Sequence, residues 1–143
     1  MLVRLMYASR AADSVDAEAL SAILRKSKAN NPHVGVTGVL CFCFNAGIFL
    51  QVLEGGRNAV SMLYNRISQD PRHREVVLLS YEEIGERSFS SWSMGQVNMG
   101  RLNPALLLKY SESATLDPYS VSGKASLALF NELVATASIG AQA

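Results

Sequence analysis

Hydrophobic residues recur with two different periods along the first two thirds of the chain. Five stretches either alternate apolar and polar side chains or are apolar throughout, which predicts β-strands. Two further stretches place apolar residues at i, i+3, i+4 and i+7, which predicts helices that end near residues 30–32 and at 70–71. The stretches predicted as strands are residues 2–9, 34–44, 47–55, 74–84 and 91–99.

The predicted order of elements is βαββαββ, because a tight turn at residues 45–47 joins two strands into a hairpin. Two βαβ crossovers joined through a hairpin predict an α/β (α+β) fold, a ferredoxin-like sandwich with two helices on one face of a mixed five-stranded sheet. Gly35 and Gly38 indicate a bulge or a close backbone approach near the start of the second strand. The periodicity does not decide which face of the sheet the helices cover.

The stretch 47–55 is apolar on both faces, which is typical of a central, covered strand. Gln51 lies in the middle of one buried row, between Phe49 and Leu53. An unpaired amide there would cost about 1–3 kcal/mol, so it needs a hydrogen-bond partner. Two partners fit the pattern: another core side chain, or a bound polar molecule lying against the strand. Tyr7 belongs to the apolar face of the first strand.

The composition changes after residue 100, which suggests a domain over 1–100 and a C-terminal helical extension over 101–143. A short helix is predicted near residues 104–109, followed by a polar segment and a second helix. The apolar stripe of that second helix is suited to cover the open face of the sheet, because an uncovered apolar face is costly. The stripe consists of Leu127, Phe130, Leu133 and Val134.

The charge and the apolar content exclude several classes of protein. The net charge is +1 and charged residues make up 17% of the chain, so no basic field for nucleic acid is expected. No signal peptide and no apolar run of about 18 residues is present, so we expect a soluble, cytoplasmic protein without a membrane partner. Cys41 and Cys43, two apart on one strand, are poorly placed for a disulfide and read as core residues. Their spacing to His33 or His73 matches no metal site, and no metal is expected.

Six motifs occur at intervals that resemble those of the BLUF family, flavin-binding blue-light receptors with this βαββαββ order. The resemblance covers about residues 2–99, and the motifs are specific in combination rather than singly. They are LMYAS, KANN, VTGVL, FLQVLEG, RISQDPRH and WSM.

The resemblance implies a photochemical core. In it Tyr7 donates a hydrogen bond to Gln51, which lies beside N5 and the C4 carbonyl of the flavin. Light would drive electron and proton transfer from Tyr7 and rearrange the hydrogen bonds of Gln51. Trp92 and Met94 match a pair of signal-relay residues and, being two apart, are expected on the same face of the fifth strand.

The resemblance also implies the residues that surround the flavin. Asn31 would bind the amide edge of the ring, while Ile23 and Ile67 would sandwich it. On the residues alone, plain helix core explains the two isoleucines better than a cofactor site does, and His73 is explained by a loop histidine and Arg66 by a surface cation. The ribityl and phosphate end of the cofactor would be lined by Asn30, Arg66, Asp70 and His73.

The resemblance implies a light sensor without catalytic turnover that binds FAD, with FMN as the alternative. Two other functions remain open: a small-molecule-binding protein or enzyme on this scaffold, and an RNA-binding module. The expected partners are further copies of the chain, as a dimer or stacked rings, and a response regulator or cyclic-dinucleotide phosphodiesterase. The tail stripe with Leu127, Phe130 and Leu133 is expected at or beside the interface between copies.

Overall fold

The elements follow the predicted order, with additions at the C-terminal end. The structure is a computed structural model that describes residues 1–97, 103–136 and the backbone of 139–140. In chain order the elements are β1 (Leu2–Ala11), α1 (Ala17–Val34), β2 (Thr37–Cys43), β3 (Ile48–Gly56), α2 (Arg57–Gln69), β4 (His73–Ile84), β5 (Gly95–Val97), α3 (Pro104–Tyr110), α4 (Gly123–Thr136) and β6 (Ile139–Gly140).

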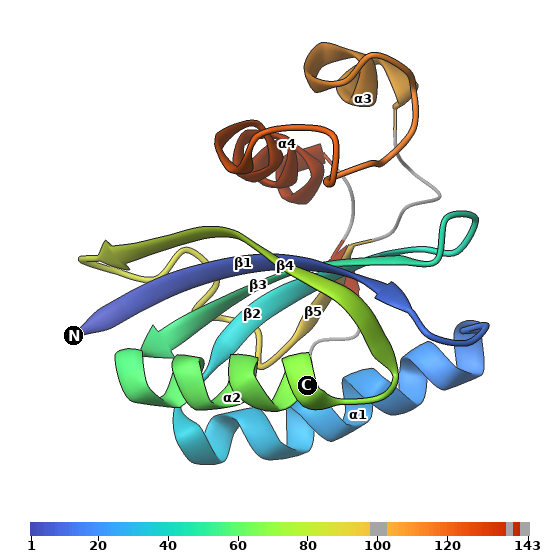
Figure 1. The fold of residues 1–143 in the computed structure, drawn as a ribbon. Helices are drawn as coiled ribbons and strands as arrows, with labels where there is room; N and C mark the ends of the chain where they lie inside the picture. Colours follow the sequence, from blue (N-terminus) through green and yellow to red (C-terminus); the bar gives the residue numbers. More distant parts are fainter. Residues whose placement is uncertain (98–102, 137–138, 141–143) are drawn as a thin grey trace.

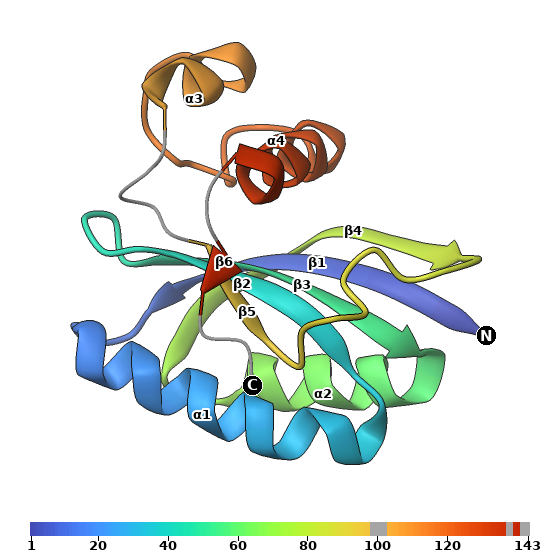
Figure 2. The same ribbon diagram turned by 180° about the vertical axis from the view of Figure 1, so that it is seen from behind.

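The strands form one mixed sheet in the order β4-β1-β3-β2-β5-β6. β3 is antiparallel to β1 and to β2, its two neighbours, so the α1 crossover joins parallel strands. β2 and β5 are parallel, and β4 is antiparallel to β1. The ferredoxin-like sandwich with five strands is therefore confirmed. The two-residue β6, beside β5 in Figure 2, is an addition that the periodicity did not predict.

Both faces of the sheet are covered, by different parts of the chain (Figure 1). α1 and α2 lie against one face and α4 against the other, with α3 farther out beside α4. Tyr7 and Phe49 pack with Leu20 and Val60, so this face of the sheet is the one that the two helices cover. The tertiary structure thus settles a choice that the sequence left open.

Helix α1 runs one turn farther than predicted. Asp16 caps its start, where the Oδ1 atom accepts a hydrogen bond from the Ala19 N–H at 2.8 Å. The expected end near residues 30–32 is wrong, because the helix continues through Pro32 to Val34. Pro32 lacks an N–H and its ring crowds the carbonyl four residues earlier, but only two helical residues follow it, and Gly35, at φ +70°, ends the helix in the left-handed conformation. Gly35 is therefore a helix cap and does not form a bulge in β2.

Gly38 accounts for the close backbone approach predicted in β2. A Cβ atom at this position would lie 2.2 Å from the backbone oxygen of Val52 on β3. The two strands can come this close only because residue 38 has no side chain.

The fifth strand is shorter than predicted and begins later. β5 spans Gly95–Val97, so Trp92 and Met94 precede it, and the predicted end of the strand at 98–99 lies outside the described residues. The expectation that the two side chains share one face is wrong. Trp92 packs with the core under α4, while Met94 is buried in the core under α1 and α2. Strict alternation requires extended backbone, and this segment is not a strand.

The C-terminal helices complete the core on the second face of the sheet. Phe130 and Leu133 of α4 are fully buried in one cluster with Leu50 and Val52 of β3. They cover the sheet within one chain, so these two residues are not available to a second copy. The expected domain boundary at residues 100 and 101 lies outside the described residues. No helix of the described part of the chain is long and apolar enough to cross a membrane.

We predict that Gly123→Ala destabilises the protein by about 1–3 kcal/mol, the usual cost of overpacking. A Cβ atom at Gly123 would lie 1.7 Å from the backbone oxygen of Leu79, so α4 would have to move away from β4. Urea unfolding measures the change, with Gly85→Ala as the matched control because a Cβ at Gly85 meets open space. Equal stability of the two variants would contradict the close docking of α4.

Candidate functional site

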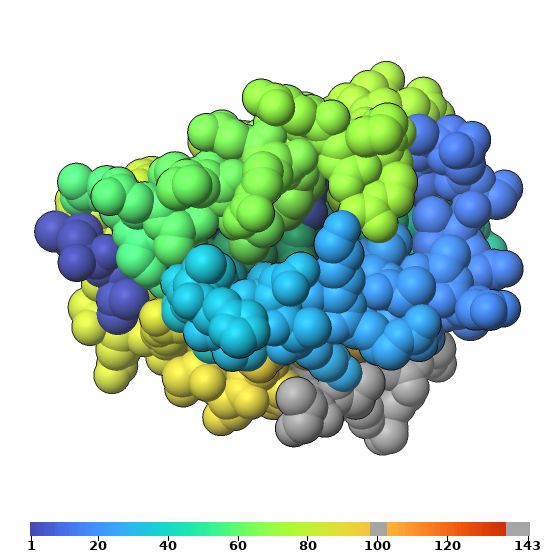
Figure 3. Space-filling model, turned by 90° about the horizontal axis from the view of Figure 1, so that it is seen from below, coloured from blue at the N-terminus to red at the C-terminus, as the bar shows by residue number. Residues whose placement is uncertain are grey.

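A cavity of about 480 Å³ opens between α1 and α2 on the helix-covered face of the sheet. Figure 3 looks onto this side and shows the surface hollowed between the blue residues of α1 and the green residues of α2. Tyr7 of β1, Leu40 of β2, and Phe49 and Gln51 of β3 line it from the sheet. Its volume lies within the range of pockets for drug-sized ligands, about 300–1,000 Å³.

The buried amide of Gln51 is hydrogen-bonded at both ends. Tyr7 and Gln51 stand directly opposite each other on β1 and β3, and the Tyr7 hydroxyl donates to Gln51 Oε1. Gln51 Nε2 donates to the Met94 Sδ atom at 3.1 Å. Core side chains therefore satisfy the amide, which was the first of the two partners considered from the sequence. Because Tyr7 and Gln51 also line the cavity, a molecule in it would meet the same groups.

The phenol of Tyr7 is held in its protonated form. Burial, first of all, and the neighbouring Tyr64 and Asp70 raise the pKa of Tyr7 above its ordinary value of 10. The Tyr64 ring lies 5.7 Å from that of Tyr7, centroid to centroid. Tyr7 is therefore a hydrogen-bond donor at any physiological pH.

Asn31 connects the helix wall to the segment that carries Met94. Its side chain is buried, and Nδ2 donates to the backbone oxygen of Ser93 at 3.0 Å. Ile23 of α1 and Ile67 of α2 are half-buried and add aliphatic surface to the two helix walls of the cavity. The cavity therefore combines branched aliphatic walls with amide groups.

Ionisable side chains gather at the end of the cavity formed by residues 70–73. Arg72 Nη2 contacts Asp70 Oδ2 at 2.6 Å, and hydrogen bonding to Arg72 lowers the pKa of the Asp70 carboxyl to about 2. His73 Nδ1 lies 2.7 Å from Ser9 Oγ, and burial lowers the pKa of the His73 imidazole. Asp70 is therefore ionised and His73 neutral at physiological pH.

All eight residues that the family resemblance placed around the cofactor line this cavity, as does Tyr7. Trp92 and Met94 are not among the lining residues, and Met94 reaches the site through Gln51. Within the described residues, no group of three or more metal-ligating side chains is close enough to hold an ion. Eight further residues, which were not predicted from the sequence, also line the cavity: Lys26, Ser27, His33, Val34, Leu40, Phe49, Leu63 and Arg72.

Helical spacing could have identified part of that missing set. Lys26, Ser27 and Asn30 follow Ile23 by three, four and seven residues, so they share its face of α1. Leu63 precedes Ile67 by four residues on α2. Asn30 was already among the predicted residues, and Lys26 adds a positive charge to the lining that the predicted set did not contain.

The comparisons with known proteins agree on one family. Residues 2–95 match the model of the BLUF family, described as sensors of blue light using FAD. Photoactivated adenylate cyclase subunit beta of Euglena longa is 37% identical over 94 residues, which are 65% of this chain and 11% of that protein. BlrB, a BLUF protein in its dark state, superposes with a TM-score of 0.75 and 31% identity, covering 94% of this chain and 95% of that one.

A third similar structure is Klebsiella pneumoniae BlrP1 with FMN and cyclic diGMP, with a TM-score of 0.66 and 25% identity. The match covers 96% of this chain and 31% of BlrP1. This chain thus spans 11% of the length of the cyclase subunit and about a third of BlrP1. The segment matched by the family model contains β1 to β4 and both helices around the cavity. The chain therefore belongs to the BLUF family of blue-light sensors.

Proposed function

We propose that this chain is a blue-light photoreceptor that holds a flavin non-covalently in the cavity between α1 and α2. The observation that carries the proposal is the hydrogen bond from Tyr7 to Gln51 on the sheet side of that cavity. The phenol of Tyr7 is a hydrogen-bond donor, and the amide of Gln51 is an acceptor that can reorient. The two groups are in contact, and both line the cavity. No further titratable group is needed for the light-driven step proposed below.

The chemistry of the cavity lining fits a flavin. An isoalloxazine ring is a flat plate that needs apolar groups above and below it and hydrogen-bonding groups along its edge. Ile23 and Ile67 supply the former, and the amides of Asn31 and Gln51 supply the latter. The volume of about 480 Å³ suits a ring system with the start of its side chain.

The basic residues of the lining suit the polar remainder of the cofactor. Lys26, Arg66 and Arg72 line the cavity, and Asp70 and His73 offer hydrogen bonds to ribityl hydroxyls. Arginine and lysine are the usual partners of phosphate groups. We propose FAD as the cofactor, in line with the description of the family, and FMN as the alternative to test, because the BlrP1 structure contains FMN.

A bound flavin would supply absorption of blue light and an acceptor for an electron and a proton. Tyr7 is suited to give both, because its hydroxyl stays protonated and is already aimed at Gln51. When Tyr7 loses its proton it ceases to be a donor, and the Oε1 atom of Gln51 loses its partner. The amide can then rotate and present Nε2 to Tyr7 instead.

Met94 gives the two orientations of Gln51 different energies. In the structure, Nε2 donates to the Met94 sulfur, which is a weak acceptor and carries no proton. A rotated amide would place Oε1 beside that sulfur, where no donor is available. The contact with Met94 therefore favours the observed orientation, and Gln51 in the rotated form has to find a donor elsewhere in the cavity.

The signal is proposed to leave the protein as a change of association. BLUF modules occur together with effector domains. One relative is named as a photoactivated adenylate cyclase subunit, and the BlrP1 structure contains cyclic diGMP besides FMN. For this chain we propose a homo-oligomer and a separate response regulator or cyclic-dinucleotide phosphodiesterase that distinguishes the dark and lit states. A light-dependent free-energy difference of about 1–3 kcal/mol changes such an affinity from severalfold to a hundredfold.

We predict that Tyr7→Phe and Gln51→Leu still bind flavin but lose the small, reversible red shift of the visible band under blue light. The first substitution removes only the hydroxyl, and the second removes only the reorientable amide. Absorption spectra before and after illumination provide the measurement. Tyr81→Phe, on the exposed side chain of Tyr81 in β4, is the matched control and should shift normally. A normal red shift in either core variant would disprove the proposed roles.

The pKa of Asp70 should rise toward its ordinary value of 3.8 in an Arg72→Gln variant. The folded-state pKa lies below the unfolded one, so the ionised carboxylate stabilises the fold above about pH 4, and this contribution is lost as the pH falls toward 2. Carbon NMR of the carboxyl group follows the titration, and Arg74→Gln is the control because Arg74 makes no contact with Asp70 in the structure. An unchanged titration in Arg72→Gln would contradict the ion pair.

Met94→Ala should leave most of the absorption shift intact and abolish the light-dependent change of association. The substitution removes the sulfur at Gln51 Nε2 but neither Tyr7 nor the amide itself. Size-exclusion chromatography with light scattering, in the dark and under blue light, compares it with the wild type. Met62→Ala, on an exposed methionine, is the control. A wild type with the same mass in both states would remove the basis for self-association as the output.

A further inference from the structure

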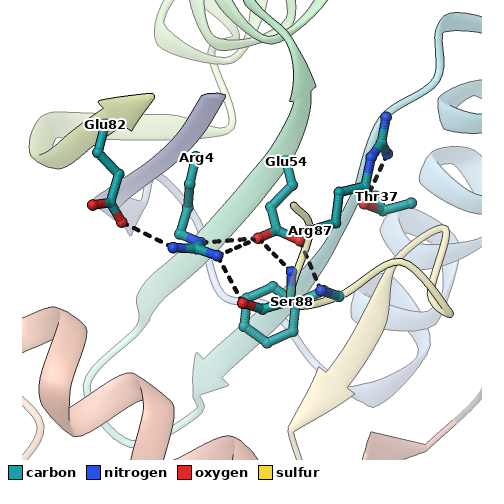
Figure 4. A network of polar contacts seen from close by, with 7 residues as sticks. Arg4, Thr37, Glu54, Glu82, Arg87 and Ser88 are labelled. Carbon is teal, nitrogen blue, oxygen red and sulfur yellow. Dashed lines mark hydrogen bonds and ion pairs between the residues drawn. The ribbon is translucent and has the colours of Figure 1, made fainter. Parts of the chain in front are cut away.

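A second buried polar residue of β3 lies outside the cavity. Glu54 is fully buried and follows Gln51 by three residues, so its side chain is on the opposite face of the sheet. It belongs to a row of residues that stand directly opposite one another on four adjacent strands. In sheet order this row consists of Glu82, Arg4, Glu54 and Thr37 (Figure 4).

Arg4 links the two carboxylates of the row. Its Nη2 atom lies 2.8 Å from Glu54 Oε2, and its Nη1 atom donates to Glu82 Oε1 at 2.9 Å. The Arg4 side chain is largely buried, and the Glu54 side chain has no exposed surface. A buried carboxylate without partners would be very costly, so this row constrains everything that contacts it.

The segment 85–94, between β4 and β5, is bound to this row. The backbone N–H groups of Ser88 and Phe89 donate to the two oxygens of Glu54, at 3.0 and 2.7 Å. Ser88 Oγ also accepts from Arg4 at 2.7 Å. Arg87 donates to Thr37 Oγ1 at 3.0 Å and to the Gly35 oxygen at 2.7 Å, as Figure 4 shows for Thr37. Charge-assisted bonds to backbone groups fix the path of the chain as well as the side chains.

The same segment reaches both cores of the protein. Phe89 is buried beside Phe130 of α4, with ring centroids 6.3 Å apart in an edge-on arrangement. The Trp92 oxygen accepts from the Gly38 N–H at 3.1 Å. Two residues later, Met94 lies on the other side of the sheet at Gln51. Glu54 therefore holds the segment at Ser88 and Phe89, five residues before Met94, and the bonds of Gly38 to Trp92 and of Asn31 to Ser93 continue this hold up to Met94.

We propose that Glu54 is a positioning residue of the light response, which holds the segment 85–94 so that Met94 contacts Gln51 while Phe89 contacts α4. Glu54 neither lines the cavity nor contacts Gln51; it acts through the backbone of Ser88 and Phe89, and through Arg4, which donates to Ser88 Oγ. The light-dependent part of this inference rests on the proposed function, whereas the holding of the segment does not. A residue that merely stabilised the fold would leave the position of Met94 unchanged.

The test uses the full chain with two substitutions, Glu54→Gln and Glu54→Asp. The first keeps the length of the side chain and removes its charge and one acceptor oxygen. The second keeps the charge near Arg4 but is one methylene too short to reach the N–H groups of Ser88 and Phe89. It therefore tests the holding of the segment even if Glu54→Gln does not fold. Glu83→Gln is the matched control, because Glu83 also pairs with an arginine, Arg57, but on the exposed surface.

The first readouts do not require flavin. Hydrogen exchange of the Ser88 and Phe89 amides should be roughly ten- to a hundredfold faster in both Glu54 variants, since a bond to a charged group is lost. Trp92 is the only tryptophan of the chain, so acrylamide quenching of its fluorescence reports directly on the segment and should increase. The control should match the wild type in both. Unchanged exchange and quenching in the two Glu54 variants would overturn the inference.

The second readout is the spectrum of the flavin-loaded protein. If the segment is released, Met94 no longer favours one orientation of Gln51, so the dark absorption band of each Glu54 variant should move slightly toward the lit position, by the same small amount as in Met94→Ala, and most of the light-induced shift should remain. A dark band at the wild-type position, despite faster exchange, would overturn the role in the light response. A different outcome is faster exchange in the Glu54 variants and no flavin binding in any protein, including the wild type. It would refute the proposed function but support the holding of the segment by Glu54.

Discussion

The burial of β3 on both faces is the constraint on which the rest of this structure depends. Every residue from Ile48 to Gly55 is buried, and β1 and β2 occupy both edges of the strand. Two of these residues, Gln51 and Glu54, carry buried polar groups. Since an unmet buried amide or carboxylate is costly, the surrounding chain has to bring partners to each of them.

The partners of the two groups come from the same strand and the same segment. β1 supplies Tyr7 to Gln51 and Arg4 to Glu54, because both pairs stand directly opposite each other in the register. The segment 85–94 supplies Met94 to Gln51, and the backbone N–H groups of Ser88 and Phe89 to Glu54. A polar network in which every member is satisfied specifies one arrangement, since any shift would leave a buried group unpaired. The segment is thus specified from both faces of the sheet.

This arrangement separates the site from the rest of the fold. The cavity lies under two helices whose side chains leave a space against the sheet, and its amides and cations suit a flavin. The opposite face is closed by α4, whose Phe130 and Leu133 replace solvent over Leu50 and Val52. The segment 85–94 contacts both sides, because Phe89 and Trp92 pack under α4 and Met94 packs under α1 and α2. A change at Gln51 that moves Met94 would therefore reach the face where α4 lies through a short stretch of chain.

The sequence by itself determined the elements and most of the cavity lining. Period-two and period-3.6 patterns depend on local geometry, so the strands, the two helices and the face shared by Phe49 and Gln51 could be predicted. The motifs placed Tyr7 and Asn31 around one site with four residues of RISQDPRH, and all of these line the cavity; the four are Arg66, Ile67, Asp70 and His73. Lys26 and Ser27, three and four residues after Ile23, lie on the same face of α1 and could have been predicted in the same way.

The tertiary structure alone decided which face the helices cover, where α1 ends, and on which sides Trp92 and Met94 lie. Both faces of β3 are apolar, so its pattern is the same whichever side the helices occupy. Gly35 ends α1 by its backbone conformation rather than Pro32 by its ring. Met94 and the amides that meet Glu54 lie far along the chain from β3, on a segment too irregular for any period. Such contacts follow from the packing of distant segments, which local patterns do not record.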